Sequence, residues 1–305
     1  MPSAPTTSTA DLQEFLGATR EAVNRQLAIW CTRVQREIGG PVGEAMAYSL
    51  AAPGKRLRPA LVIAAHRELG GSGDATELAA AVEVVHTYSL VHDDLPCMDD
   101  DDLRRGRPTT HVAFDVGTAL VAGYRLVPLS ARVLASGAAT LGLPDERIAA
   151  ISTELYRASG ASGMIGGQVL DLEAEGRSVT LDELDRIHRC KTGALITASA
   201  VIGGLAAGAD AAAVDTLRAY GREIGLAFQI VDDILDATAT SEELGKTAGK
   251  DAAQHKATFA TLLGLEEAGA AARRHAQSAI DLFGGHGIDS RLLAGLARYI
   301  LERKK

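Results

Sequence analysis

The stretch from Ala75 to Asp102 reads ATELAAAVEVVHTYSLVHDDLPCMDDDD, and its character changes along its length. As far as about Leu95 it is mostly apolar and built from residues that form helices readily, which favours a helix in the centre of the protein. From Asp93 onward it holds six carboxylates in ten residues. The stretch therefore predicts a buried helix that ends in a cluster of acids.

Helical periodicity continues along the rest of the chain. Between Asp11 and Ile38, apolar residues recur at steps of three and four, as an amphipathic helix requires. Further helices are predicted over Val42–Leu50, from Arg58 to Gly70, and over Ala194–Ala209, which is too short and too rich in Gly and Ala to span a membrane. Glycine-containing breaks follow at 106–108, 142–144, 176–177, 208–210, 245–249 and 284–287.

The same patterns define the expected fold class. No run of alternating residues is long enough for a sheet, and no break is long enough for a linker. Aromatic residues are only 4% of the chain and Ala is abundant, which agrees with helices packed closely through small side chains. We expect an all-α protein with a single domain over residues 1–305, about ten to twelve helices, and a disordered segment over residues 1–10.

Composition narrows the classes of function. The formal net charge is −8, so the chain as a whole is not expected to bind nucleic acid. Its cysteines, Cys31, Cys97 and Cys190, are odd in number and widely separated, which indicates free thiols in a reducing compartment. The Ser/Thr/Pro-rich start has no basic flank followed by an apolar core, so we do not expect it to act as a signal peptide. We expect a cytoplasmic protein without membrane insertion.

The first aspartate motif, Asp93 to Asp102, has two interpretations. An acidic run is usually a solvated loop, but this one directly follows the most apolar helix and precedes Arg104 and Arg105. Crowded carboxylates resist ionising together unless a cation neutralises them, and oxygen ligands suit Mg²⁺. Asp93 and Asp99 would lie about 240° apart on a continuous helix, so the helix is expected to end near Pro96.

The second aspartate motif consists of Asp232, Asp233 and Asp236 in an otherwise apolar segment. On a helix, Asp232 and Asp236 share one face, with Asp233 beside them. A structural set of salt bridges is the alternative, but no Lys or Arg stands at helical spacing before Lys246. Two acidic motifs in one all-α chain together favour a metal site.

Basic residues also gather in short segments. Lys55, Arg56 and Arg58 follow Gly54 and offer three cations for an anionic group such as a phosphate, and Lys191 and the segment 245–251 offer more. The Gly-rich segment that contains Lys246 faintly suggests a phosphate-binding P-loop. We reject that interpretation because no strand precedes the segment and the motif is incomplete.

These motifs, in this order, resemble the trans-isoprenyl diphosphate synthases, and most closely the bacterial farnesyl diphosphate synthases. The resemblance runs from about Val42 to the C-terminus. It rests on both aspartate motifs and on the segments 54–59, 104–106, 166–168, 191–193 and 228–229. It implies the isoprenoid synthase fold, an orthogonal helical bundle around a central cavity, and a homodimer.

The resemblance also implies a role for each matching residue. Mg²⁺, three ions per active site with Mn²⁺ as a substitute, would be held by Asp93, Asp94, Asp99, Asp232 and Asp236, with Asp233 assisting. The allylic diphosphate would be held by Arg104, Lys191, Lys246 and Lys256. Isopentenyl diphosphate would be held by Lys55, Arg58, His86 and Arg105. Thr192 and Gln229 would lie near the developing carbocation.

The implied reaction is the condensation of dimethylallyl or geranyl diphosphate with isopentenyl diphosphate to farnesyl diphosphate, with release of diphosphate. The allylic substrate would ionise to a carbocation in a cavity poor in water. Ser89 and Tyr88 lie about one helical turn before Asp93, so the bulky Tyr88 is expected to form the cavity floor and to limit the product to fifteen carbons. Tyr124, Arg125 and Pro128 depart from close relatives and leave product length and assembly open.

Other functions fit less well. A geranyl or geranylgeranyl diphosphate synthase would differ only in product length. A terpene cyclase would share the first motif but would not need basic groups for a second diphosphate. A non-catalytic subunit of a heteromeric synthase would usually lack one of the aspartate motifs, and both are present here.

Overall fold

The computed structural model describes residues 8–238, 257–285 and 290–303, and the chain divides into two compact units. The unit that carries the first aspartate motif, here the first-motif unit, comprises Phe15–Ala60 and Gly73–Leu143. The second-motif unit comprises Met1–Glu14, Leu61–Ser72 and Pro144–Lys305. A single domain over residues 1–305 stays a prediction.

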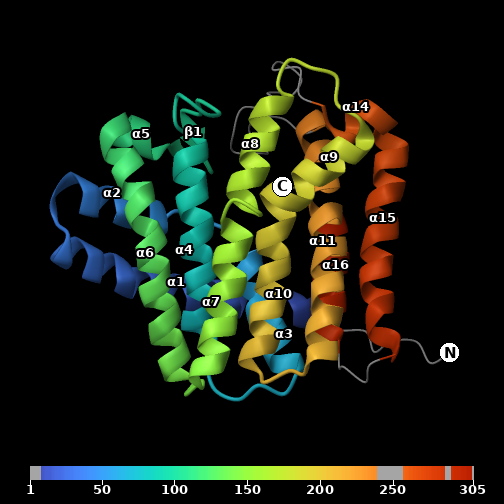
Figure 1. Ribbon diagram of the computed structural model, residues 1–305, viewed down its shortest axis with the longest axis horizontal. Coiled ribbons are helices and arrows are strands. Elements are labelled where there is room, and N and C mark those ends of the chain that lie inside the picture. The colour runs from blue at the N-terminus through green and yellow to red at the C-terminus, as the bar shows by residue number, and fades with distance from the viewer. Residues whose placement is uncertain (1–7, 239–256, 286–289, 304–305) are drawn as a thin grey trace. The chain divides into compact units, whose positions relative to one another are not determined.

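Helices form nearly all of the regular structure in the described residues (Figure 1). The chain begins with α1 (Thr9–Glu37), α2 (Gly40–Leu50), α3 (Leu57–Glu68), α4 (Thr76–Asp93), β1 (Leu103–Arg104), β2 (Arg107–Pro108), α5 (Thr110–Ala113), α6 (Val116–Thr140) and α7 (Asp145–Ser159). It continues with α8 (Met164–Ala174), α9 (Leu181–His188), the π-helix η1 (Arg189–Gly193), α10 (Ala194–Ala206), α11 (Ala211–Thr238), α14 (Phe259–Leu263), α15 (Leu265–Asp281), the 3₁₀ helix η2 (Leu282–Gly285) and α16 (Arg291–Glu302). The all-α prediction is confirmed.

Where the residues are described, the predicted breaks fall between α-helices, and residues 284 and 285 of the last break belong to the 3₁₀ helix η2. Helices α1 to α4 begin and end within three residues of the bounds expected from the apolar pattern. Of the ten residues expected to be disordered, 1–7 lie outside the described residues, and Thr9 and Ala10 belong to α1. The only strands in the described residues form one hairpin, in which Leu103 pairs with Pro108 and Arg104 with Arg107.

Helix α4 forms the core of the first-motif unit and lies alongside α6 (Figure 1). Its first half is built from small apolar residues, and Ala79, Ala80 and Ala81 have no exposed surface. Small side chains let neighbouring helices approach closely, so the helix expected to be central is buried on nearly all sides.

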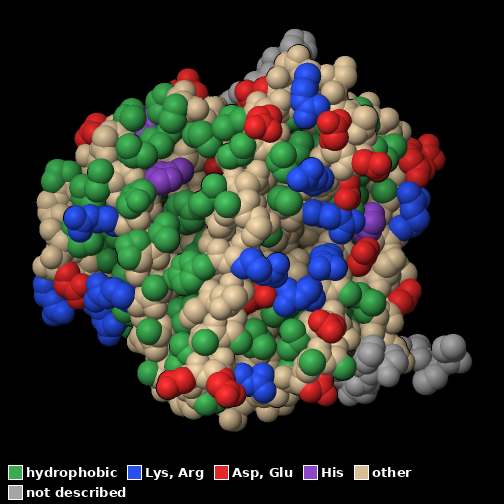
Figure 2. Space-filling view, in the orientation of Figure 1, with side chains coloured by type: hydrophobic (Ala, Val, Ile, Leu, Met, Phe, Trp, Pro, Cys, Tyr) green, Lys and Arg blue, Asp and Glu red, His purple; other side chains and the backbone are tan. Residues whose placement is uncertain are grey.

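Helix α6 begins at a capped end and carries an exposed apolar face. The carboxylate of Asp115 accepts a hydrogen bond from the backbone N–H of Thr118 at 2.8 Å. The helix continues through Pro128 to Thr140. One side packs inward, whereas the other exposes what we call the α6 apolar stripe, visible as apolar side chains gathered over this helix in Figure 2: Val116, Leu120, Val121 and Tyr124.

The second-motif unit is organised around α10 and α11, which pack against each other. Nearly every residue of α10 is buried, as expected for Ala194–Ala209. The fully buried Tyr220 of α11 donates a hydrogen bond from its hydroxyl to the carbonyl of Leu293 at 2.7 Å. Within the described ranges, no helix combines the length and the apolar character needed to cross a membrane.

Candidate active site

The first aspartate motif lies where α4 ends and the chain turns back. Asp93 is the last residue of the helix and Asp94 is its C-cap. The backbone N–H of Asp99 donates to the carbonyl of Asp93 at 2.9 Å, and that of Asp101 donates to the carbonyl of Asp94 at 3.3 Å. The helix therefore ends before Pro96 as predicted, and the turn draws Asp99 back toward Asp93.

Arg104 binds directly into this motif. Its Nε and Nη2 both lie 2.6 Å from Oδ1 of Asp94, whose side chain is only 4% exposed. Burial raises the pKa of Asp94, although Arg104 opposes that shift. Burial also disfavours the charged form of Arg104, but the carboxylates of Asp94, Asp93 and Asp101 outweigh it and raise the pKa of the guanidinium. The hairpin β1–β2 thus supplies the cation that partly neutralises the acidic turn.

A separate basic group in the same unit centres on His86. Nη1 of Arg58 lies 3.3 Å from Nε2 of His86, and because a guanidinium only donates, the ring nitrogen accepts. Burial holds the pKa of His86 well below its ordinary value, and Arg58, Arg105, Arg104 and Arg56 lower it further. His86 is therefore neutral with its proton on Nδ1. Lys55 is exposed to solvent and lies in the loop that precedes α3, three residues before Arg58.

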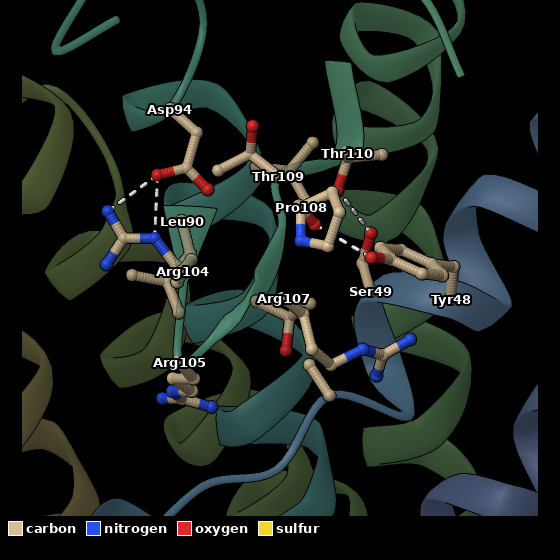
Figure 3. Close-up of a pocket in the computed structure, with 13 residues that line it drawn as sticks. Tyr48, Ser49, Leu90, Asp94, Arg104, Arg105, Arg107, Pro108, Thr109 and Thr110 are labelled. Carbon is tan, nitrogen blue, oxygen red and sulfur yellow. Dashed lines mark hydrogen bonds and ion pairs between the residues drawn. The ribbon is translucent and has the colours of Figure 1, made fainter. Parts of the chain in front are cut away.

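A small pocket, partly open to solvent, lies between α2, α4 and the hairpin (Figure 3). Arg104 and Asp94 stand on one side, and Arg107 stacks over the Tyr48 ring on the other, with 4.3 Å from its Cζ to the ring centre. Tyr48 donates a hydrogen bond to the carbonyl of Pro108 at 2.7 Å. The pocket reaches the buried edge of the first aspartate motif from the side of α2.

In the second-motif unit, Lys191 and Thr192 belong to the π-helix η1 that joins α9 to α10. Nζ of Lys191 lies 2.6 Å from Oδ2 of Asp171. A side chain at Gly167 would bring its Cβ within 2.1 Å of the Lys191 backbone nitrogen, so only glycine lets α8 approach η1 this closely. This contact explains Gly167 in the 166–168 segment. The sequence interpretation missed Asp171, although it stands one helical turn after Gly167.

Thr192 and Gln229 form a short chain of hydrogen bonds. The Thr192 hydroxyl donates to the amide oxygen of Gln229 at 2.9 Å, and the amide nitrogen donates to Oδ1 of Asp233 at 3.1 Å. Oδ2 of Asp233 accepts from the backbone N–H of Phe259 at 2.8 Å and lies 3.4 Å from Nε2 of His188. Both the oxygen and the nitrogen of the Gln229 side-chain amide are thus held by hydrogen bonds. The structure thus brings Thr192 and Gln229, both expected near the carbocation, into direct contact.

The other two acids of the second aspartate motif differ in environment. Asp232 is 41% exposed and lies 2.7 Å from Nη2 of Arg303. That guanidinium also donates to the carbonyl of Phe228 at 2.6 Å and stacks over the Phe228 ring. Asp236 is buried, one turn further along α11. The sequence interpretation missed Arg303 because it searched for cations only at helical spacing. Lys246 and Lys256 lie outside the described residues.

The comparisons with known proteins agree with this arrangement of motifs. A family model described as polyprenyl synthetase matches residues 41–283. The chain is 40% identical to a farnesyl diphosphate synthase of Bacillus subtilis over 97% of its length and 99% of that protein, and 47% identical to one of Escherichia coli over 87% and 90%. The chain belongs to the polyprenyl synthetase family. The resemblance recognised from the sequence motifs is confirmed.

A solved structure gives the same fold for this polyprenyl synthetase family member. The crystal structure of a geranyltransferase from Helicobacter pylori, complexed with magnesium and isoprenyl diphosphate, matches with a TM-score of 0.79 and 32% identity over 98% of both chains. The expected isoprenoid synthase fold is therefore confirmed.

The donors present in this family member suit a hard divalent cation. Both aspartate motifs offer only carboxylate oxygens, which are the ligands that Mg²⁺ prefers. Among the described residues, no three His, Cys, Asp or Glu side chains converge closely enough to hold a metal by themselves. Mg²⁺ commonly completes its coordination with water and substrate phosphates. A site that offers only one or two carboxylates to each ion is therefore consistent with this chemistry.

The residues expected to limit product length lie on α4, as predicted. Tyr88 is buried, and its ring meets His92 edge-on at 5.7 Å between centres. Burial, assisted by Asp93, raises the pKa of the Tyr88 hydroxyl to about 12. Ser89 is also buried and donates its hydroxyl to the carbonyl of His86 at 2.9 Å. A bulky, neutral ring therefore lies one to two helical turns below the first motif.

Proposed function

We propose that this prenyltransferase condenses dimethylallyl and geranyl diphosphates with isopentenyl diphosphate to give farnesyl diphosphate and inorganic diphosphate. The observation that carries the proposal is the first-motif unit, which holds an acidic turn closed by Arg104 and a separate basic group around Arg58 and His86. Two diphosphate substrates need two such polar groups. The farnesyl diphosphate synthases among the relatives support the same reaction.

The metal is proposed to be Mg²⁺, three ions per active site, with Mn²⁺ as a substitute. The carboxylates that would hold it are Asp93, Asp94, Asp99, Asp232 and Asp236, with Asp233 acting through its neighbours. Bound Mg²⁺ would supply positive charge against the diphosphate as it leaves. The magnesium in the H. pylori geranyltransferase supports this choice.

The allylic diphosphate is proposed to be held by Arg104, Lys191, Lys246 and Lys256. Arg104 and Lys191 are each already oriented by a carboxylate, Asp94 and Asp171 respectively. Cations placed in advance stabilise the negative charge that grows on the leaving oxygen, and they do so without reorganising during the reaction. Isopentenyl diphosphate is proposed to be held by Lys55, Arg58, His86 and Arg105.

Thr192 and Gln229 are proposed to face the developing carbocation. The hydrogen bonds from Thr192 and to Asp233 fix which end of the Gln229 amide lies on each side. Oriented dipoles of this kind stabilise a cation in a cavity from which water is excluded. The double bond of isopentenyl diphosphate then attacks the cation, and the departing diphosphate takes up the proton that is lost.

Product length provides the test of this function. The purified protein is incubated with isopentenyl diphosphate and, in turn, with dimethylallyl, geranyl or farnesyl diphosphate, and the products are sized by chromatography. We expect the first two primers to yield fifteen carbons and farnesyl diphosphate to remain unextended. Extension of farnesyl diphosphate would identify a geranylgeranyl diphosphate synthase, and accumulation of ten carbons would identify a geranyl diphosphate synthase.

We further propose that the enzyme forms a homodimer and that it acts in the cytoplasm. The α6 apolar stripe supports self-association, because Tyr124 is 74% exposed beside Leu120 and Val121 on one helix. Exposed apolar side chains gathered on one face commonly mark contacts between proteins. Tyr124 and Arg125, which depart from the expected family pattern, would then act on assembly and not on the substrate.

A further inference from the structure

Arg56 stands between Lys55 and Arg58, yet its side chain turns into the protein. The residue is 4% exposed. Its Nη1 lies 2.6 Å from Oε1 of Glu83 on α4, its Nε donates to Oδ1 of Asn24 on α1 at 2.9 Å, and its Nη2 donates to the carbonyl of Ala52 after α2 at 2.7 Å. One guanidinium therefore joins three elements of the first-motif unit. Its charge is already paired inside the protein.

The contacts of the Arg56 side chain hold its backbone in an unusual conformation. Its φ is +54°, in the left-handed region that residues with a side chain rarely adopt. Such a conformation persists only where surrounding contacts hold it. Helix α3 begins at the next residue, Leu57. With Arg56 turned inward, Lys55 on one side stays exposed, and Arg58 on the other reaches His86.

The loop that precedes Arg56 also holds Arg105. Its Nη1 donates to the carbonyl of Pro53 at 2.5 Å. A Cβ at Gly54 would lie 2.5 Å from that Nη1 and 3.2 Å from Nη1 of Arg56, so the loop presses against both guanidinium groups. Burial lowers the pKa of Arg105, and Glu83 opposes that shift while Arg56 adds to it. Glu83 thus offsets part of the repulsion among cations gathered in this unit.

We propose that the Arg56–Glu83 ion pair is a positioning device for the isopentenyl diphosphate site. It holds the loop Gly54–Arg58 so that Lys55 and Arg58 present their charges to the diphosphate, while Arg56 does not contact the substrate. The inference rests on the proposed function and replaces the direct substrate contact expected for Arg56 from the sequence. A buried ion pair of this kind sets geometry more than it adds stability.

The experiment measures the Michaelis constants for isopentenyl and geranyl diphosphates in four proteins: wild type, E83Q, R56M and the double variant R56M/E83Q. We expect either single change to raise KM for isopentenyl diphosphate roughly ten- to hundredfold, because small misplacements of binding groups have effects of this size. KM for geranyl diphosphate should stay within about twofold. KM for isopentenyl diphosphate in the double variant should not exceed the larger of the two single-variant values, because both changes disable the same ion pair.

A direct substrate contact gives a different pattern. If Arg56 touches the diphosphate, R56M raises KM for isopentenyl diphosphate but E83Q, which keeps the guanidinium, leaves it unchanged. That outcome overturns the proposal. Equal increases in both Michaelis constants, in parallel with a fall in Tm, would also overturn it by showing a general structural defect.

Two further proteins separate positioning from folding. R56M/E83L replaces the pair with apolar side chains and leaves no unpaired charge in the interior, so it should fold with a Tm near that of the wild type. It should still bind isopentenyl diphosphate weakly when titrated alone in a calorimeter, and wild-type binding would overturn the proposal. The matched control is R132M/E37L, an exposed ion pair of 2.7 Å in the same unit, which should leave binding unchanged. Wild-type protein that neither binds nor consumes isopentenyl diphosphate would refute the proposed function itself.

Discussion

At the scale of single residues, both carboxylate oxygens of Asp233 already have partners within the protein. It accepts from Gln229 and from the backbone of Phe259, and it lies beside His188. A buried carboxylate with these partners can act by orienting its neighbours. Its effect on the reaction is therefore expected to pass through the amide of Gln229.

Replacing Gln229 tests that role. Gln229→Leu removes the oriented amide but keeps the size of the side chain, and we expect kcat to fall about a hundredfold, as for the loss of one preorganised dipole. Steady-state kinetics with geranyl and isopentenyl diphosphates provides the measurement. Gln277→Leu is the matched control, because Gln277 also donates to an Asp four residues later, at 2.8 Å, but on the exposed surface of α15. An unchanged kcat in Gln229→Leu would contradict the assigned role.

Replacing Tyr88 tests the floor of the cavity. Tyr88→Ala removes a buried ring below the first motif. The prenyl product should then grow by a further isoprene unit, and the major product should change from fifteen to twenty carbons. Mass spectrometry of the dephosphorylated products measures the shift. Tyr156→Ala on α7 should retain the wild-type product. A fifteen-carbon product from Tyr88→Ala would place the floor elsewhere.

Residue types and their order in the chain predict which acids and bases would carry the site, and those roles stay a prediction. Partners that come from distant segments were not predictable. Asp171, Arg303 and Glu83 pair with site residues that stand 20, 71 and 27 positions away. Helical spacing predicts contacts only between residues three or four positions apart. These distant pairs are therefore seen only in the three-dimensional structure.

At the scale of elements, the N-terminal end of α9, opposite the end that continues into η1, is held by a capping box. The Thr180 hydroxyl accepts from the N–H of Glu183, and the Glu183 carboxylate accepts from the N–H of Thr180 at 2.9 Å. The bond from the Thr180 backbone, together with Arg177 and the Thr180 hydroxyl, lowers the pKa of Glu183 to about 2. This box begins the helix that leads into Lys191 and Thr192.

The pKa shift has a definite consequence for stability. Because the folded pKa of Glu183 is about 2 and its ordinary value is 4.5, its stabilising effect is complete above pH 4.5 and is lost as the pH falls toward 2. Glu183→Gln should therefore unfold at a lower temperature than the wild type at pH 7, and the difference should narrow below pH 4.5. Thermal unfolding followed by circular dichroism measures both values. A difference that is constant from pH 7 to pH 3 would contradict this assignment.

Helix boundaries were largely predictable, but one element was not. Apolar periodicity and Gly or Pro breaks place α1 to α4 within three residues of their observed ends. The π-helix at Arg189–Gly193 has no comparable signal, because it arises where α8 packs against the backbone at Lys191. The π-helical turn that carries Lys191 and Thr192, two proposed substrate-binding residues, thus lies at a tertiary contact that spacing along the chain does not reveal.

At the scale of the whole molecule, the α6 apolar stripe predicts how the chain assembles. Tyr124→Asp places a charge in the middle of the stripe, so the proposed homodimer should dissociate to monomers. Light scattering after size-exclusion chromatography measures the mass. Ile165→Asp, at an exposed position on α8 outside the stripe, is the control and should remain dimeric. A dimeric Tyr124→Asp protein, or a monomeric wild type, would contradict the proposal.

The central claim is that this single polypeptide joins two diphosphate substrates with the help of Mg²⁺. The most direct measurement follows the purified chain with geranyl diphosphate, isopentenyl diphosphate and Mg²⁺, and quantifies farnesyl diphosphate and inorganic diphosphate together. We predict equal amounts of the two products, none without isopentenyl diphosphate, and none after chelation of the metal. Release of diphosphate from an allylic substrate alone, with a hydrocarbon as the product, would contradict the claim, as would turnover that requires a second kind of polypeptide.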